Sequence, residues 1–338
     1  MGLAAATLLA QLFTVGLAPL DLGDTPPAMR SASACEPCHG EAHAEWRASR
    51  HAQSWQNPIF QREYQARPSA WCVNCHAPLG LQAAVNEGVN CAVCHVRDGR
   101  ILAARHRPGS PHDTDVRADF GTPGYCAGCH QFNFPRFADA PEEHEKVVGY
   151  TAHPMQNTVA EHAAGPLAGE SCRSCHAQSA GRHLYPGAHD PKMLERALEL
   201  TVCRAGDDLV ATVKNRGAGH RVPTGDVHRH LVLRAWRPSA PEALSELVLG
   251  RRFAPLPDGG KRLVADTTLA PGEARALRVP LDRRAAPDEP VSVELRYVYT
   301  IDEFPPHPIG EPAWVTIEAL RTTASALARC EGRSDRGR

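Results

Sequence analysis

The motif Cys-x-x-Cys-His occurs five times in this chain and constrains the fold more than any other feature. The copies occupy residues 35–39, 72–76, 91–95, 126–130 and 172–176. Two cysteines separated by two residues match the two vinyl groups on one porphyrin edge, and the adjacent histidine is placed to ligate the iron. A single motif can arise by chance or bind zinc. Five copies that all end in histidine predict five covalent haem c groups.

The motifs account for ten of the twelve cysteines. The predicted thioether-forming residues are Cys35, Cys38, Cys72, Cys75, Cys91, Cys94, Cys126, Cys129, Cys172 and Cys175. The predicted proximal iron ligands are His39, His76, His95, His130 and His176. A scaffold of disulfides is the alternative for so many cysteines, and the histidine after each pair argues against it.

Chain length and composition indicate how the motif-bearing half is built. The chain has 338 residues, enough for about two domains. Residues 35–176 leave about 28 residues for each haem, too few for an ordinary apolar core. Aromatic residues make up only 6%. We therefore expect the porphyrins themselves to supply much of the core. The net charge of −1 gives no support to nucleic-acid binding.

The first 25 residues resemble a secretory signal segment, because an apolar run begins at Leu3. No Lys or Arg precedes this run, which departs from the usual pattern. An uncleaved N-terminal anchor is the alternative, although the run is short for a membrane span. Either reading predicts export, so we expect a periplasmic or extracellular protein.

The rest of the chain is expected to form two domains and a tail. Residues 30–197 are predicted to be a pentahaem cytochrome c domain of short helices and irregular segments, the clearest helix being 41–55. Residues 198–326 show alternating apolar and polar residues, which predicts an antiparallel β-sandwich of immunoglobulin-like size. Its expected strands are 198–202, 209–213, 231–236, 247–249, 276–279, 291–299 and 314–319. Residues 327–338 read as a polar tail.

Two cysteines outside the motifs, Cys203 and Cys330, flank the predicted β domain. An oxidising compartment permits a disulfide between them. A buried free thiol at Cys203 is the alternative.

The sixth iron ligand decides whether a haem only transfers electrons or also binds a substrate. The chain has 18 histidines, so 13 remain for the distal faces and the surface. His51 lies twelve residues after His39 on a predicted helix that leads away from its own haem, so we expect it to ligate a neighbouring one. His112 follows a proline that fixes its position, and His106 is its rival.

Three further histidines are candidate distal ligands. His183 and His189 closely follow the fifth motif, and a turn there could return either to a haem. His220 lies in the Gly-rich stretch 215–225 between two predicted strands, where glycine permits close approach to another surface. Ligation by His220 would couple the two domains. The alternative is a histidine hydrogen-bonded within its own loop.

Residues 30–190 resemble the multihaem cytochromes related to the tetrahaem cytochrome c of nitrifiers and to hydroxylamine oxidoreductase. The stretches that carry the resemblance are 35–39 with Trp46 and 49–52, then 72–78, 88–95 and 125–130. The resemblance implies stacked haem pairs and His51 as a distal ligand. The chain departs from the similar ammonia-forming nitrite reductases, which place Lys at the catalytic motif, because all five of its motifs end in His. No equivalent of the crosslinked tyrosine of hydroxylamine oxidoreductase is identified.

These features favour an electron-transfer protein over an enzyme, and no catalytic residue is assigned. The first hypothesis is a carrier that passes electrons along closely packed bis-His haems to other cytochromes or to a membrane quinol oxidase complex. The second is an oxidoreductase acting on a small nitrogen or sulfur species at one open haem. The third is a subunit of an extracellular cytochrome assembly, formed by self-association.

Overall fold

The computed structural model describes residues 20–80, 85–106, 108–138, 146–177, 182–257, 260–281, 289–300 and 313–330. Of the expected signal segment, residues 1–19 lie outside these ranges. Of the expected tail, residues 331–338 lie outside them. The chain divides into two compact units. The first comprises 1–187, 253–264 and 307–311, and the second comprises 188–252, 265–306 and 312–338. No helix among the described residues is long and apolar enough to cross a membrane.

The first unit contains all five motifs, four of them on short helices, and irregular segments join its elements. Its α-helices are α2 (Gly40–Arg47), α3 (Pro58–Ala66), α4 (Ala70–His76), α5 (Cys91–His95), α6 (Pro123–His130), α7 (Thr158–Ala163) and α8 (Cys172–His176). Its 3-10 helices are η1 (Pro27–Met29), η2 (Ala32–Ala34) and η3 (Val85–Glu87). Its strands are β1 (Val96–Arg97), β2 (Arg100–Ala103), β3 (Thr114–Val116), β4 (Gln131–Phe137) and β5 (Val147–Asn157).

The helix predicted over residues 41–55 is wrong in length, because α2 ends at Arg47. Residues 48–56 form turns rather than helix. The buried Ser49 hydroxyl accepts a hydrogen bond from the backbone N–H of Ala52. Serine competes in this way with the helical backbone bonds and favours a turn.

A β-hairpin in the first unit was not predicted from the sequence. Strand β4 follows directly after the fourth motif and pairs antiparallel with β5. The register shifts at three places, and both strands contain proline, Pro135 and Pro154. Trp71 of α4 packs edge-on against Phe132 and donates to the Tyr150 hydroxyl at 2.9 Å. The hairpin therefore supports the helix that carries the second motif.

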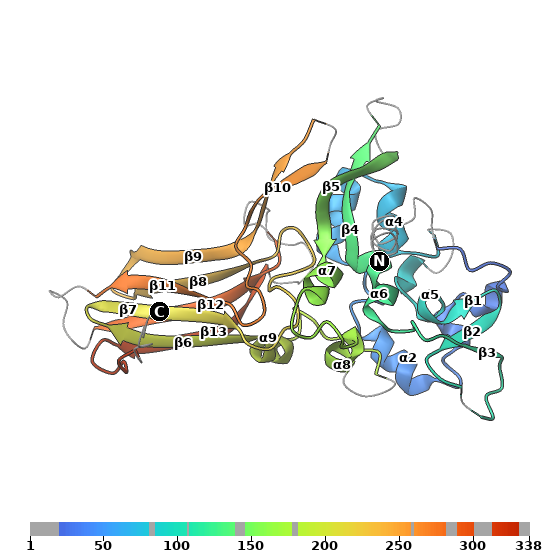
Figure 1. The fold of residues 1–338 in the computed structure, drawn as a ribbon, viewed down its shortest axis with the longest axis horizontal. Coiled ribbons are helices and arrows are strands. Elements are labelled where there is room, and N and C mark those ends of the chain that lie inside the picture. The colour runs from blue at the N-terminus through green and yellow to red at the C-terminus, as the bar shows by residue number, and fades with distance from the viewer. Residues whose placement is uncertain are drawn as a thin grey trace, which may run out of the picture. The chain divides into compact units, whose positions relative to one another are not determined.

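From residue 198 onward the described chain, which includes most of the second unit, forms mainly antiparallel sheet, as the alternation predicted (Figure 1). One sheet has the order β10-β9-β8-β12-β13 and the other β11-β7-β6. Their bounds are β6 (Leu198–Ala205), β7 (Asp208–Asn215), β8 (His230–Arg237), β9 (Ala240–Pro255), β10 (Lys261–Asp266), β11 (Ala274–Pro280), β12 (Pro290–Val298) and β13 (Trp314–Thr323). All seven expected strands are present, and β10 is additional. Helix α9 (Pro191–Ala197) precedes β6.

The core of the second unit follows the two-residue period of its strands. The buried alternating residues are Leu209, Ala211 and Val213 on β7, Leu231, Leu233 and Ala235 on β8, and Val293, Leu295 and Tyr297 on β12. Figure 1 shows the two sheets as stacked layers. Burial of one face of each sheet against the other accounts for the alternation seen in the sequence.

Cys203 on β6 forms a disulfide with Cys330, so of the two alternatives left open by the sequence the disulfide is present and the free thiol is wrong. The C-terminal segment also pairs with the end of β6, where Cys330 N–H donates to the Arg204 carbonyl at 2.9 Å. In the chain-entropy account, a loop this long contributes about 5 kcal/mol to the free energy of unfolding.

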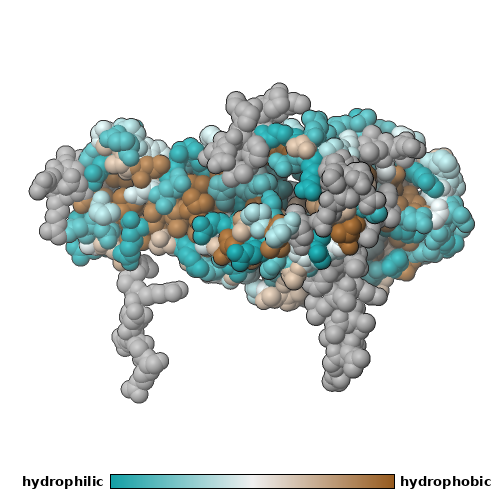
Figure 2. Space-filling view, turned by 90° about the horizontal axis from the view of Figure 1, so that it is seen from above, coloured by the Kyte–Doolittle hydropathy of each residue, from teal (hydrophilic) through white to brown (hydrophobic). Residues whose placement is uncertain are grey.

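Apolar and polar residues are mixed over the surface. Figure 2 shows brown, hydrophobic areas between teal, hydrophilic ones on the face in view. Large apolar side chains that remain exposed include Val116, Val148, Val248 and Val264. Single exposed apolar residues of this kind are usual in soluble proteins.

A buried carboxylate organises one face of the five-stranded sheet. Glu294 on β12 accepts a hydrogen bond on Oε2 from Arg234 Nε at 2.8 Å and one on Oε1 from the Thr316 hydroxyl at 2.6 Å. Arg296 Nε lies 2.9 Å from the same Oε1. Burial opposes ionisation, but the hydrogen bonds from Arg296, Thr316 and Arg234 outweigh it. Together they hold the pKa of Glu294 below its usual value.

We predict that Glu294→Gln lowers the free energy of unfolding by about 2 kcal/mol at pH 7, because it leaves two arginines without their shared anion. A carboxylate with a lowered pKa stabilises the fold above its unfolded pKa and loses that effect as pH falls through the folded pKa. The difference from wild type should therefore shrink below about pH 4. Hydrogen exchange of β8 and β12 measures the effect locally. The exposed Glu242→Gln on β9 is the control, and an equal loss of protection there would contradict the assignment.

Candidate haem sites

Four of the five motifs lie on short helices that end at the motif histidine, namely α4, α5, α6 and α8. Residues three apart on a helix share one face, so each cysteine pair points to the same side. The first motif forms a turn instead, in which His39 N–H donates to the Cys35 carbonyl at 2.9 Å and α2 begins at the next residue. Every motif therefore brings its two sulfurs and its imidazole together locally.

Helices this short are not stable alone, and side-chain caps hold their first turns. Ser69, Asn90 and Ser171 accept hydrogen bonds from the first free N–H groups of α4, α5 and α8. Asn90 is 2% exposed and also donates to the Arg30 carbonyl at 2.8 Å. The caps fix where each motif begins relative to its surroundings.

Three proximal histidines are oriented by backbone carbonyls. Nδ1 lies 2.9 Å from the Ser54 carbonyl in His76, 3.0 Å from the Leu102 carbonyl in His95, and 2.7 Å from the Pro186 carbonyl in His176. A carbonyl at this position makes Nδ1 the protonated nitrogen. Nε2 is then left to bind metal, and the hydrogen bond raises its basicity.

Three motif histidines face a second histidine at nearly the same separation. The ring centroids are 6.3 Å apart for His39 and His112, 6.4 Å for His130 and His51, and 6.2 Å for His95 and His183. These are histidines of three different motifs, each paired with one that the sequence singled out. His51 lies beside the fourth motif, not beside the first motif that precedes it.

The separation fits one iron atom between two imidazoles. Two metal–nitrogen bonds of about 2 Å, with each ring centre roughly 1.2 Å beyond its nitrogen, place the centroids about 6.3 Å apart. The donor set and the spacing of these side chains therefore fit a haem iron ligated on both faces.

Two other candidate ligands have different surroundings. The His189 ring stacks on Tyr299, with centroids 4.1 Å apart and an interplanar angle of 9°. His220 Nδ1 lies 2.8 Å from the Arg221 carbonyl, and the His220 carbonyl accepts from Asn215. Iron ligation by these two residues stays a prediction. The rival His106 is exposed.

Cysteines of different motifs lie against one another. The Cys91 thiol donates to Cys35, and this hydrogen bond lowers the pKa of Cys35 to about 7. Cys126 donates in the same way to Cys172, which lowers the pKa of Cys172 to about 7. Thioether sulfurs do not titrate, but the contacts still show that the first motif adjoins the third and the fourth adjoins the fifth.

The fourth motif has two further neighbours. The thiol of Cys75, in the second motif, donates to Cys129. Cys94 of the third motif is close enough to Cys129 and Cys126 for their charges to interact. Burial is the main cause that raises the pKa of Cys94 to about 11. The attachment points thus form one connected set in which the fourth motif is central.

Several residues around the motifs were not identified from the sequence. Phe60 stacks on His76 with centroids 3.5 Å apart and an angle of 5°. Ser54 donates its hydroxyl to the His76 carbonyl at 2.9 Å. The Tyr185 ring lies near both His51 and His183. Burial raises the pKa of Tyr185 to about 12. No sequence signal marks these residues, because each contact joins segments that are distant in the chain or depends on a local turn.

Gly88 is required where its loop meets the turn that carries His51. Its φ is +57°, and an added Cβ would lie 2.5 Å from the His51 carbonyl oxygen and 2.9 Å from that of Ala52. The backbone N–H of Val89 donates to the same His51 carbonyl at 2.9 Å. Only glycine allows this approach, so Gly88 contributes to the position of His51.

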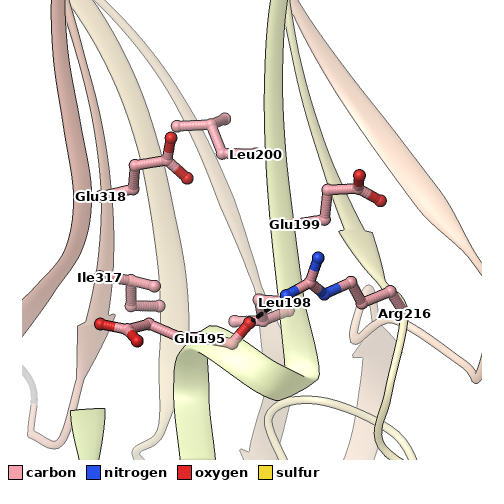
Figure 3. A pocket seen from close by; sticks show the side chains of 7 residues that line it. All are labelled: Glu195, Leu198, Glu199, Leu200, Arg216, Ile317 and Glu318. Atoms are coloured by element: carbon pink, nitrogen blue, oxygen red, sulfur yellow. Dashed lines mark hydrogen bonds between the residues drawn. The ribbon is translucent and has the colours of Figure 1, made fainter. Parts of the chain in front are cut away.

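A pocket in the second unit has a different character. It is lined by Glu195, Leu198, Glu199, Leu200, Arg216, Ile317 and Glu318, between the edge strands β6 and β13 (Figure 3). Arg216 donates to the Glu195 carbonyl at 2.9 Å. The pocket contains neither cysteine nor histidine. Within the described ranges, no group of three or more His, Cys, Asp or Glu side chains is arranged to hold a metal ion.

Two comparisons bear on these sites. The family model described as cytochrome c554 and c-prime matches residues 34–96, which contain the first three motifs. A crystal structure of a penta-heme cytochrome c552 from Thermochromatium tepidum is similar in fold, with a TM-score of 0.67 and 23% sequence identity. The match covers 88% of this chain and all of that one. No curated protein matches the sequence significantly.

We predict that Gly88→Ala lowers the free energy of unfolding by about 2 kcal/mol, because the carbonyl of His51 must move to admit the methyl group. Gly109→Ala is the matched control, since Gly109 also has a positive φ, +78°, but faces open space. It should cost about 1 kcal/mol from backbone strain alone. Urea denaturation of the haem-loaded protein measures both. Equal losses in the two variants would contradict the close approach at Gly88.

Proposed function

We propose that this chain, a multihaem c-type cytochrome, is an exported pentahaem carrier that moves electrons between redox partners. Electron transfer by covalently bound haem is supported by the motifs, the matching family model and the similar fold. The number of five haems, the export and the bis-His ligation are the proposed refinements. The observation that carries the bis-His ligation is the set of three imidazole pairs separated by 6.2–6.4 Å.

The proposed ligand assignments follow from these pairs. His39 and His112 would hold the haem of the first motif, His95 and His183 that of the third, and His130 and His51 that of the fourth. His76 and His176 are the proposed proximal ligands of the other two haems. His189 and His220 remain proposed distal ligands without an assigned iron.

The protein's own residues tether, orient and shield the cofactor. Each cysteine pair fixes one porphyrin edge, and the carbonyls of Ser54, Leu102 and Pro186 orient three proximal imidazoles. A haem c supplies a one-electron iron couple when bound, with a potential set by axial ligands, burial and nearby hydrogen bonds. Two imidazoles on one iron leave no face for a substrate, which favours a carrier.

The contacts between motifs support a continuous route. Sulfur contacts link the first motif to the third and the fourth motif to the second and the fifth, and Cys94 links the third to the fourth. Each of these sulfurs would be bonded to a porphyrin edge, so neighbouring attachment points bring haem edges together. A connected set of edges is what a chain of one-electron transfers needs.

Two alternatives remain distinct from this proposal. An oxidoreductase acting on a small nitrogen or sulfur species needs an iron with one free face. A subunit of an extracellular cytochrome assembly would self-associate with rising concentration. The proposed partners of a carrier are other cytochromes or a membrane quinol oxidase complex. We also propose an immunoglobulin-like classification for the second unit, supported by its two antiparallel sheets.

We predict that His112→Ala converts one haem from low spin to high spin, because the iron of the first motif loses its second imidazole. Electron paramagnetic resonance of the oxidised protein counts the spin states. His106→Ala is the matched control, because this exposed histidine is six residues away in the same part of the chain. A fully low-spin His112→Ala protein, or the same conversion in His106→Ala, would contradict the assignment. A high-spin signal in the wild type that shifts with cyanide would instead favour the oxidoreductase.

The number of haems can be tested by mass. We predict that the double variant Cys172→Ala/Cys175→Ala is lighter than wild type by one haem beyond the change in side chains. Intact-protein mass spectrometry measures this directly. The double variant Cys203→Ala/Cys330→Ala loses the disulfide and should retain five haems. An unchanged haem count in the first variant would refute attachment at the fifth motif.

A further inference from the structure

The short segment 183–186 lies against three different motifs. His183 faces His95 of the third motif, and Tyr185 lies beside His51, which faces His130 of the fourth motif. The next residue, Pro186, offers its carbonyl to Nδ1 of His176 in the fifth motif at 2.7 Å. Four consecutive residues therefore reach the ligand sets of three proposed haems.

Tyr185 has an unusual backbone conformation at the centre of this segment. Its φ is +47°, and the only other non-glycine residue with positive φ among those described is Asp98. Bulky side chains rarely occupy this left-handed region, because Cβ approaches the neighbouring carbonyl. Such a residue persists only where its surroundings hold it, and an observed outlier is a reason to look for a role.

The Tyr185 ring touches histidines of two proposed haems. Its centroid is 5.1 Å from that of His51, with an interplanar angle of 59°, and 6.4 Å from that of His183, with an angle of 82°. These tilted and edge-on arrangements are the ones that aromatic rings prefer. A ring packed against an imidazole in this way restricts rotation of the imidazole plane.

The residue with positive φ also lies between the other two contacts of the segment. His183 and the Pro186 carbonyl stand on either side of Tyr185 and serve different motifs. The segment is anchored at its start, where the His183 N–H donates to the Glu45 carboxylate at 2.8 Å. With a relaxed backbone at Tyr185, the ring and the carbonyl would not both keep these contacts.

We propose that Tyr185 is a positioning residue that sets the imidazole orientations of His51 and His183 and the hydrogen bond on His176, and so adjusts three haems together. The proposal rests on the ligand assignments proposed above. Imidazole orientation and the hydrogen bond on a ligating histidine are means by which a protein tunes its metal sites. One residue would then set the relative potentials of the third, fourth and fifth haems.

The test compares substitutions at Tyr185 in the haem-loaded protein. Tyr185→Gly and Tyr185→Asn both tolerate the left-handed backbone but remove the ring. Either should keep five haems by mass and leave every iron low spin. Electron paramagnetic resonance should show changed g values for two low-spin haems, and a redox titration should show shifted potentials. Tyr185→Phe keeps the ring and should reproduce the wild-type spectrum and titration.

Asp98→Gly is the control for backbone strain. It removes the backbone strain at the other described non-glycine residue with positive φ, in the turn between β1 and β2. It should leave the g values and potentials unchanged. Tyr185→Trp places a larger ring in the same position and should shift the same signals as the ringless variants. Wild-type g values and potentials in both a ringless variant and Tyr185→Trp would overturn the proposal. If His112→Ala showed bis-His ligation to be absent, the proposed function would fail instead.

Discussion

The first unit holds three pairs of imidazoles with ring centroids 6.2–6.4 Å apart, the separation expected for two rings that ligate one iron atom. Two apolar clusters among its described residues are small, with Leu22, Ala92 and Val96 in one and Ala32, Trp46 and Ala52 in another. Such clusters cannot hold the seven short α-helices by themselves, because apolar burial stabilises in proportion to area. Under the proposed assignment, the covalent tethers and the axial bonds of the haems would supply much of the cohesion. The second unit needs no such support, since continuous buried rows run along β7, β8 and β12.

Local features of the first unit could be predicted from the sequence, and its long-range pairs could not. A Cys-x-x-Cys-His motif defines its own geometry within five residues, and its fivefold repetition in this chain predicts haem attachment without knowledge of the fold. The partner of each proximal histidine depends on the fold. His51 could be recognised as a candidate, but its position beside His130 follows from the loop at Gly88, whose close approach has no signature in one sequence. His189 shows the same limit, because its stacking on Tyr299 joins distant segments.

The strands differ in predictability for a related reason. In the second unit the two-residue period records burial between two sheets, so seven strands were visible. In β4 the burial does not alternate, since Phe132 and Phe134 are buried but Gln131 and Pro135 are as well. The hairpin of β4 and β5 packs on Trp71 beside the second motif. Its prolines and register shifts interrupt the alternation of apolar and polar residues by which a strand is recognised in a sequence. The polar and apolar pattern of β4 therefore does not indicate which of its faces is buried.

Sharing of residues between haems follows from the same shortage of chain. About 28 residues for each predicted haem are too few to provide a separate set of orienting groups for every iron. The turn that carries His51 also supplies the Ser54 carbonyl to His76, and segment 183–186 reaches three motifs. A change at one such residue alters more than one ligand set. Under the proposed ligand assignments, a change in one of these shared segments would shift the potentials of more than one haem.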